Sequence, residues 1–283
     1  MQKQKCIGII GAGSIAEAML DGILDQSIFL PENIYITNRN NDDRLHFFRE
    51  NYGVNTTRDY KEIVSKCRYL IIAVKPADVS ELLTILSKWV TMDHIIITLA
   101  AGITTEFVEI SLGKKIQVIR AMPNTSCKVK ESATVIALGR NAKKEAWDFA
   151  KEIFSSIGTV SMVEENMLDA VTGLSGSGPA YVYLFMEAMI EAGIEAGLPR
   201  SLSEKLTIQT VFGAAKMVLD TGESPKRLRE KVTTPGGTTM AGIKVLENAD
   251  FTDTFIEAVK SATRRSQEMM TEHSSLHKFP HVL

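Results

Sequence analysis

A glycine-rich segment near the start of the chain has the spacing of a dinucleotide-binding loop. Residues 11–16 (GAGSIA) form a GxGxxA pattern that follows the apolar run 6–10 and opens a helical pattern. In such loops the first glycine permits a tight turn, the second lets the backbone approach a pyrophosphate, and a small third residue lets helix and strand pack. N–H groups at the helix start face the phosphates. A tight turn without a ligand is the alternative, but the context favours a dinucleotide bound by Gly11, Gly13, Ser14, Ile15 and Ala16.

The end of the next apolar run indicates the kind of dinucleotide. Asn38 and Arg39 stand where an NAD-binding protein usually has an acidic residue that binds the ribose 2′-hydroxyl. A guanidinium instead suits a 2′-phosphate, because it forms paired, charge-assisted hydrogen bonds. We therefore expect NADPH, with NADH as the alternative. A solvated surface arginine would also explain Arg39, and the nearby Asp42 and Asp43 weigh against a bound phosphate.

Three further loops follow apolar runs and are expected to line the same cleft, because ligands bind open α/β sheets at the carboxyl ends of the strands. One loop begins a helix with proline, and the others contain small or amide side chains. Each loop alone is ordinary. Together they predict a nicotinamide site formed by Ala73, Val74, Lys75, Pro76, Ala101, Gly102 and Asn124.

Two clusters of small residues, 175–181 (SGSGPAY) and 233–239 (TTPGGTT), run into helical patterns in the second half of the chain. Successive N–H groups in such loops can form an anion-binding nest. A Gly/Pro turn with an N-cap explains either cluster alone, but two in one short domain favour a ligand. Ser175 and Ser177 are expected to shape a pocket, because the sequence shows no histidine base that would activate them as nucleophiles.

The elements that must position these residues alternate between strand and helix in the first half. Near-continuous apolar strands separated by amphipathic helices indicate a parallel sheet covered on both faces. We therefore expect an α/β fold, with a Rossmann-type doubly wound sheet over residues 1–163. The expected strands are 6–10, 33–37, 69–74, 94–100 and 116–121, the helices are 15–25, 42–51 and 79–89, and a further strand–helix–strand unit covers 133–162.

Residues 164–272 are expected to form an all-helical domain. Its first long helix, 180–196, is polar only at three glutamates, so most of its circumference is expected to be buried, and in a small domain this favours subunit packing. Later helices are expected at 201–220, from Pro225, at 239–246 and at 252–271. The tail 273–283 carries His273, His277 and His281 at every fourth position, and we expect a disordered end in preference to a metal site.

Composition excludes several other classes of protein. The 283 residues suit two domains, and 45% apolar with 23% charged residues is ordinary for a globular protein. The formal net charge of −2 gives no bias toward nucleic acid or membranes. Cys6, Cys67 and Cys127 lack CxxC spacing, which fits a reducing cytoplasm without a disulfide framework. No apolar run reaches the about 18 residues of a membrane span, and the N-terminus shows no signal-peptide pattern.

Taken in order, the motifs resemble those of the pyrroline-5-carboxylate reductase family over about residues 5–271. Two are highly specific: LSGSGPAY at 174–181 and PGGTT at 235–239. The others are GxGxxA, AVKP at 73–76, AAG at 100–102 and MPNT at 122–125. The chain departs from the family at Ser126, where a proline is frequent, and at Tyr60, where an asparagine is frequent.

The resemblance implies hydride transfer from NAD(P)H to the imine carbon of 1-pyrroline-5-carboxylate, giving L-proline in the last step of proline biosynthesis. It also implies a homodimer whose interface holds the active site, with higher assemblies of dimers in the family. Thr239 would aid proton delivery to the ring nitrogen, and N–H groups of residues 237–239 would bind the carboxylate. An N-cap role for Thr239 and a plain helix-start role for Glu165 are the alternatives. The implied substrate-binding residues are Glu165, Ser175, Gly236, Gly237, Thr238 and Thr239.

Two other functions are compatible with a dinucleotide-binding domain followed by a helical domain. A hydroxyacid dehydrogenase of the 6-phosphogluconate dehydrogenase type would need an acid–base lysine in the first long helix, and residues 180–198 contain none. A non-catalytic NADPH-binding regulator would be expected to have degraded substrate loops, whereas PGGTT is intact. We therefore expect an oxidoreductase that acts on a C=N bond of a small molecule.

Overall fold

The chain folds into two compact units. The computed structural model describes residues 6–276, with side chains described to Met270, so the side chain of His273 and all of His277 and His281 lie outside the described residues. The first unit holds the described residues up to Gly176 and those from Ser261 on, and the second is Ser177–Lys260. This division differs from the expected boundary at 163/164, which stays a prediction. The segment to Gly176 and the end of the last helix belong to the first unit, because Asn124 bonds Ser175 and Asp169 bonds Ser266.

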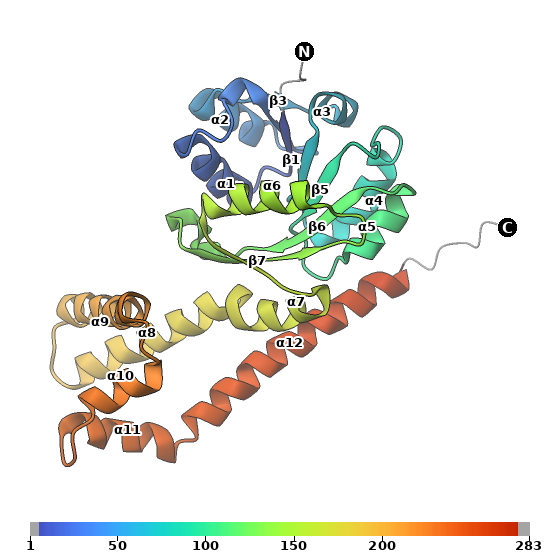
Figure 1. Ribbon diagram of the computed structural model, residues 1–283. Helices are drawn as coiled ribbons and strands as arrows, with labels where there is room; N and C mark the ends of the chain where they lie inside the picture. The colour runs from blue at the N-terminus through green and yellow to red at the C-terminus, as the bar shows by residue number, and fades with distance from the viewer. Residues whose placement is uncertain (1–5, 277–283) are drawn as a thin grey trace. The chain divides into compact units, whose positions relative to one another are not determined.

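The first unit is built on one sheet (Figure 1). Within the described residues it has eight strands in the order β3-β2-β1-β4-β5-β6-β7-β8, and all neighbours are parallel except β6 and β7, which are antiparallel. This order confirms the Rossmann-type doubly wound sheet. The strands are β1 Ile7–Ile10, β2 Ile34–Thr37, β3 Asn55–Thr57, β4 Tyr69–Ile72, β5 Ile95–Thr98, β6 Gln117–Met122, β7 Ser132–Leu138 and β8 Gly158–Met162.

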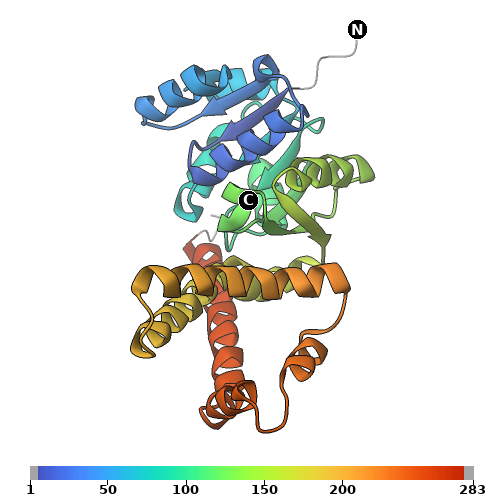
Figure 2. The same cartoon turned by 90° about the vertical axis from the view of Figure 1, so that its left-hand side faces the viewer.

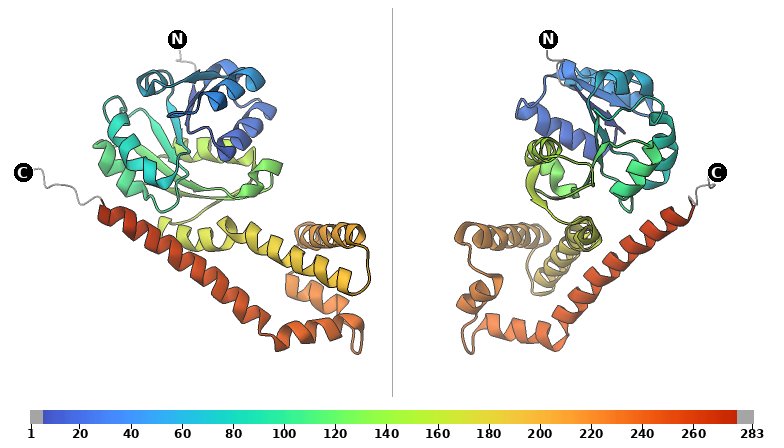
Figure 3. Two further views of the ribbon diagram at one scale, coloured as in Figure 1. Left: turned by 180° about the vertical axis from the view of Figure 1, so that it is seen from behind. Right: turned by 45° about the vertical axis from the view of Figure 1, so that its right-hand side comes forward.

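Helices cover both faces of this sheet, because the central strands are isoleucine-rich and buried on both sides. Residues of α1 (Ser14–Asp25), α2 (Asp42–Tyr52) and α6 (Lys144–Ser155) form one apolar cluster with the sheet. Residues of α3 (Tyr60–Lys66), α4 (Pro76–Leu86) and α5 (Thr105–Leu112) form the other. Helices α4 and α5 lie side by side over their face (Figures 1 and 3). The elements β3, α3 and α5 were not predicted from the sequence.

The topology places two of the predicted loops next to each other. Strands β1 and β4 are neighbours in the sheet, with Ile10 opposite Ile72. Strands β2 and β3, which lie between them in the sequence, are on the other side of β1. The order therefore reverses at the β1/β4 pair, and a crevice is expected outside the carboxyl ends of these two strands. The glycine-rich loop leaves β1 there, and the loop that begins at Ala73 leaves β4.

The second unit is helical, as expected. Its helices are α8 (Gly178–Glu195), α9 (Arg200–Thr221), α10 (Pro225–Val232), α11 (Thr238–Asn248) and the first part of α12 (Phe251–Leu276). Helix α9 crosses α8 (Figure 2), where the hydroxyl of the buried Ser203 donates to the carbonyl of Ile190. No helix of the described chain is long and apolar enough to cross a membrane.

The expectation that helix 180–196 is mostly buried is wrong within one chain. No residue of α8 is buried, and Tyr183 and Leu184 are more than half exposed. The second unit is too small to cover this apolar helix with its own residues. Large exposed apolar surfaces mark interaction sites.

Candidate active site

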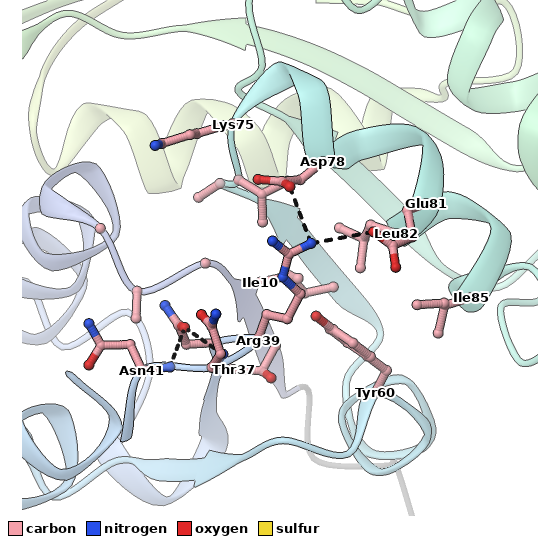
Figure 4. Close-up of a pocket in the computed structure, with 17 residues that line it drawn as sticks. Ile10, Thr37, Arg39, Asn41, Tyr60, Lys75, Asp78, Glu81, Leu82 and Ile85 are labelled. Atoms are coloured by element: carbon pink, nitrogen blue, oxygen red, sulfur yellow. Dashed lines mark hydrogen bonds and ion pairs between the residues drawn. The ribbon is translucent and has the colours of Figure 1, made fainter. Parts of the chain in front are cut away.

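A cleft of about 670 Å³ opens at the carboxyl ends of β1, β2 and β4 (Figure 4). It is lined by seven of the residues predicted to bind the dinucleotide: Gly11, Gly13, Asn38, Arg39, Ala73, Val74 and Lys75. Tyr60, Asp78 and Glu81 also line it and were not predicted as ligands. The position of the cleft at the β1/β4 reversal is where an open α/β sheet binds a nucleotide.

The glycine-rich loop has the geometry that its sequence predicts. Gly11 has φ +118°, and its N–H donates to the carbonyl of Thr37 at 2.9 Å. A Cβ at Gly11 would overlap the carbonyl oxygen of Ala73, whereas a Cβ at Gly13 would meet nothing within 4 Å. Gly13 is the N-cap of α1, and Ala16 is fully buried against the sheet. The loop is thus close-packed on the protein side and open at Gly13, where a phosphate would approach the helix start.

Arg44 supports this loop from α2, and sequence reasoning missed it. Its Nε donates to the carbonyl of Ala12 at 3.0 Å, and its terminal nitrogen pairs with Glu17 at 2.6 Å. The guanidinium also lies over the rings of Phe47 and Phe48. The Arg44 guanidinium is thus held by a hydrogen bond, an ion pair and two aromatic rings, and it fixes the loop that follows β1. No local sequence signal distinguishes Arg44 from a solvated helix arginine.

Asn38 and Arg39 lie at the end of β2, as predicted. The Asn38 side chain accepts hydrogen bonds from the N–H groups of Asn40 and Asn41 at 3.2 and 3.0 Å, which fixes the turn after the strand. Arg39 projects into the cleft and is 59% exposed. The acidic residues that were expected to affect it are not its neighbours. Asp42 pairs with Arg58 at 2.6 Å, and Arg39 instead contacts Asp78 and Glu81 of α4.

The residues of the cleft fit a dinucleotide. Thr37 is fully buried, and its hydroxyl has no hydrogen-bond partner within the described part of the chain, yet Thr37 lines the cleft. Buried polar atoms normally have a partner. A ribose or phosphate oxygen at the end of β2 would provide one, while Gly13 leaves room for the pyrophosphate and Arg39 offers a cation at the ribose end.

The other predicted cofactor residues have structural roles and do not line this cleft. Ser14 and Ile15 form the first turn of α1, and Pro76 is the first residue of α4. Ala101 and Gly102 follow β5, where Gly102 has φ +73° and packs against the backbone of Met269 and Met270. The Asn124 side chain accepts from the N–H of Ser126 and donates to the carbonyl of Ser175, both at 3.1 Å. Ligand binding by these residues stays a prediction.

Glu165 is engaged by protein groups on both carboxylate oxygens. It accepts hydrogen bonds from the N–H and the hydroxyl of Thr105 at 2.7 and 2.5 Å, and it lies 3.7 Å from the guanidinium of Arg120. Its side chain is 24% exposed. These contacts cap the start of α5, so they give Glu165 a structural task. Its predicted contact with substrate stays a prediction.

Ser175 lies in a π-helical turn, Thr172–Gly176, that leads into α8. Its hydroxyl donates to the carbonyl of Val171 at 3.2 Å. The hydroxyl is therefore directed into its own helix. That Ser175 shapes a substrate pocket stays a prediction. π-Helical turns are rare and are frequent at functional sites.

The segment 233–239 forms a sharp turn into α11. Gly236 has φ +73°, and the Gly237 N–H donates to the carbonyl of Thr234 at 3.0 Å. Gly237 is the N-cap, so Thr238 and Thr239 are the first two helical residues. The alternative that Thr239 is merely the N-cap is wrong. The anion site also needs a correction: the Gly237 N–H serves the turn, whereas helix geometry leaves the N–H groups of Thr238 and Thr239 for a ligand.

The two parts of the chain match two family models. Residues 6–102 match the model described as NADP oxidoreductase coenzyme F420-dependent, and residues 165–269 match that of pyrroline-5-carboxylate reductase dimerisation. Pyrroline-5-carboxylate reductase 2 of Bacillus subtilis (strain 168) is 42% identical over 265 residues, which is 94% of this chain and 95% of that protein. The reductase of Methanosarcina acetivorans is 40% identical over 95% of this chain and 99% of its own.

Solved structures of pyrroline-5-carboxylate reductases also match the chain. The pyrroline-5-carboxylate reductase of Coxiella burnetii matches with a TM-score of 0.88 at 38% identity, over 94% of this chain and 98% of its own. The Plasmodium falciparum pyrroline carboxylate reductase, solved with NADP bound, matches with a TM-score of 0.84 at 28% identity, over 95% of this chain and all of its own.

A doubly wound sheet with a glycine-rich loop at its reversal point and a cleft that fits a dinucleotide defines a dinucleotide-binding protein. The named relatives make the chain a nicotinamide-dependent oxidoreductase. The extent and identity of the matches define it further. The chain belongs to the pyrroline-5-carboxylate reductase family.

Proposed function

We propose that this protein reduces 1-pyrroline-5-carboxylate to L-proline with NADPH, as a cytoplasmic homodimer. The observation that carries the proposal is the turn into α11, where an intact PGGTT segment has Gly237 as the N-cap and Thr238 and Thr239 as the first two helical residues. The curated relatives named as pyrroline-5-carboxylate reductases support the substrate. The dimerisation model over residues 165–269 and the exposed apolar surface of α8 support the dimer.

The substrate needs an anion site and a proton donor. Its carboxylate suits the N–H groups of Thr238 and Thr239, because the start of α11 carries the positive end of the helix dipole. The Thr239 hydroxyl is proposed to bond the ring nitrogen and aid its protonation, which makes the imine carbon a better electrophile. The bound reduced nicotinamide supplies the hydride. The protein's main contribution is therefore positioning.

The proposed binding residues follow from the same argument. Gly236, Gly237 and Ser175 shape the substrate site through backbone geometry, and Glu165 is proposed to act at its edge. The cleft residues bind the dinucleotide, with Arg39 at the 2′-phosphate. Ser14, Ile15, Ala101, Gly102 and Asn124 are proposed to complete the cofactor site.

The direct test is to mix the protein with NADPH and pyrroline-5-carboxylate and to follow the nicotinamide absorbance. We expect the absorbance to fall only when both are present, with one proline formed for each NADPH consumed. A protein that binds NADPH but never consumes it with this substrate would be a regulator, and the proposal would fail.

Replacement of Thr239 by alanine is expected to lower kcat by about 10- to 100-fold, the lower end for loss of a proton-transfer group. The matched control is Thr239→Ser, which keeps the hydroxyl at the second helical position. We expect the serine variant to retain most of the activity. Equal kcat values for the alanine variant and the wild type in steady-state assays would contradict the role of Thr239.

Replacement of Arg39 by alanine is expected to reduce the ratio of kcat/KM for NADPH to that for NADH by about tenfold, because hydrogen bonds to a charged group are worth roughly 1.5–3 kcal/mol. NADH lacks the 2′-phosphate, so its kcat/KM should change little. The control is Arg58→Ala, since Arg58 pairs with Asp42 and does not line the cleft. A ratio equal to that of the wild type would show that Arg39 does not bind the phosphate.

A further inference from the structure

Two carboxylates of α4 face the same guanidinium in the cleft (Figure 4). The Nη1 atom of Arg39 lies 3.3 Å from Asp78 Oδ1 and 3.3 Å from Glu81 Oε2. Asp78 and Glu81 are three residues apart, so they lie on one face of the helix. All three residues line the cleft that is proposed to hold the adenosine end of the dinucleotide. The cation expected to bind a 2′-phosphate is thus already shared by two anions.

Tyr60 lines the same cleft and lies in the field of the same three charges. Burial raises the pKa of the Tyr60 hydroxyl, Arg39 lowers it, and Glu81 and Asp78 raise it again. Tyr60 therefore stays neutral and adds no charge of its own. Lys75 also lines the cleft, but no ion pair joins it to either carboxylate among the described residues. The balance at the ribose end is one cation against two anions.

Helix stability accounts for only part of this arrangement. Asp78 lies in the first turn of α4, where a negative charge is favoured by the helix dipole. Glu81 lies a turn further on, where that effect has largely faded, and it still contacts Arg39. The acidic residues near Arg39 in sequence do not take part, because Asp42 pairs with Arg58.

We propose that Asp78 and Glu81 are specificity-determining residues, which compete with the 2′-phosphate of NADPH for Arg39 and thereby limit the preference for NADPH over NADH. This inference rests on the proposed role of Arg39. A 2′-phosphate carries roughly −1.5 to −2 charges at neutral pH. It must displace or approach the two carboxylates to reach Arg39, whereas the 2′-hydroxyl of NADH meets no such repulsion and can donate to a carboxylate.

The test measures binding without turnover. Dissociation constants of NADP⁺ and NAD⁺, which differ only by the 2′-phosphate, are determined by isothermal titration calorimetry for the wild type and for Asp78→Asn, Glu81→Gln and the double variant. Each neutralisation is expected to raise the ratio Kd(NAD⁺)/Kd(NADP⁺) by about fivefold, the upper end of what an exposed ion pair contributes, because the phosphate no longer has to displace that carboxylate from Arg39. The gain should come from tighter NADP⁺ binding and should shrink at high ionic strength.

NAD⁺ serves as the internal control, because a variant that is merely misfolded would lose both ligands. The matched control variant is Asp148→Asn, whose carboxylate pairs with Lys144 on α6 and lies outside the cleft. It should leave the ratio unchanged. In an Arg39→Ala background, neutralising Asp78 and Glu81 should give less than half of the gain seen with Arg39 present.

Two results would overturn the inference: a ratio for the double variant within twofold of the wild type, or the same gain with and without Arg39. These are distinguishable from failure of the proposed cofactor. If the wild type prefers NADP⁺ and Arg39→Ala lowers that preference, the proposed NADPH site stands and only the role of the two carboxylates is refuted. If Arg39→Ala leaves the preference unchanged, the proposed role of Arg39 fails as well.

Discussion

Replacement of Gly11 by alanine is expected to weaken NADP⁺ binding on the order of 100-fold and to lower the thermal stability of the protein. The added Cβ would overlap the carbonyl oxygen of Ala73, and the backbone φ of +118° disfavours any residue with a side chain. Backbone strain and overpacking each cost roughly 1–3 kcal/mol. Because the clashing atoms belong to the backbone that leaves β4, the loops of β1 and β4 must move apart, and both line the cleft. Calorimetric titration and thermal unfolding measure the two effects.

The Gly13→Ala variant separates binding from folding. A Cβ at Gly13 meets no protein atom within 4 Å, and its φ of −86° suits alanine. Its thermal unfolding midpoint should therefore match that of the wild type, whereas its NADP⁺ affinity should fall because the methyl group occupies the space of the pyrophosphate. If Gly13→Ala bound NADP⁺ as tightly as the wild type, the phosphates would not lie at this loop.

A buried ionic cluster joins separate segments of the first unit. Arg120 lies in the middle of β6 and is 1% exposed. Its terminal nitrogens lie 3.7 Å from Glu165 and 3.9 Å from Asp169, and Asp169 also accepts a hydrogen bond from Ser266 of α12 at 2.7 Å. Glu165 in turn caps α5 through Thr105. The guanidinium therefore joins β6 to the segment before α8, and Asp169 extends the cluster to the end of α12.

Replacement of Arg120 by methionine is expected to lower the free energy of unfolding by about 3–5 kcal/mol, because removing it leaves the buried Asp169 and the partly buried Glu165 without their counter-charge. Methionine retains much of the apolar volume of the side chain, so the loss of stability reflects the missing charge and not a cavity. Urea unfolding at one fixed protein concentration measures it, since a dimer's stability depends on concentration. Adding Asp169→Asn to this variant should restore part of the stability by removing one unpaired charge.

The control for Arg120 is Arg58→Met, which removes an exposed ion pair with Asp42. Exposed pairs contribute at most about 1 kcal/mol, so this variant should unfold close to the wild type. Contrary evidence would be an Arg120→Met variant as stable as Arg58→Met, or a double variant no more stable than Arg120→Met alone.

The sheet and its nucleotide loop could be predicted from the sequence because their signals are local. Isoleucine-rich runs such as Ile95–Thr98 are buried on both faces, and their spacing with amphipathic helices is sufficient to place them. β3 escaped prediction because Asn55–Thr57 is short, polar and lies at the sheet edge. The antiparallel pairing of β6 with β7 could not be predicted, because the residues of neither strand indicate its direction in the sheet.

The parts of the site that could not be predicted depend on contacts between distant residues. Arg39 and Glu81 are 42 positions apart, and Arg44 and Ala12 are 32 apart, so no local pattern links them. Arg120 is a charge inside an apolar strand, which signals a buried partner but does not identify Glu165 or Asp169. The apolar pattern of α8 predicted subunit packing, and the match of residues 165–269 to the dimerisation model supports an oligomer, while the burial expected for α8 cannot come from a single chain.

In the proposed reaction a hydride passes from the nicotinamide to an imine carbon held at the start of α11. The most direct measurement uses NADPH that carries deuterium at the transferable position of the nicotinamide, with product analysis by mass spectrometry and NMR. We expect L-proline with one deuterium on the δ carbon, formed by the wild type and in strongly reduced amount by Thr239→Ala. Proline without deuterium, or deuterium in any other product in place of proline, would contradict it.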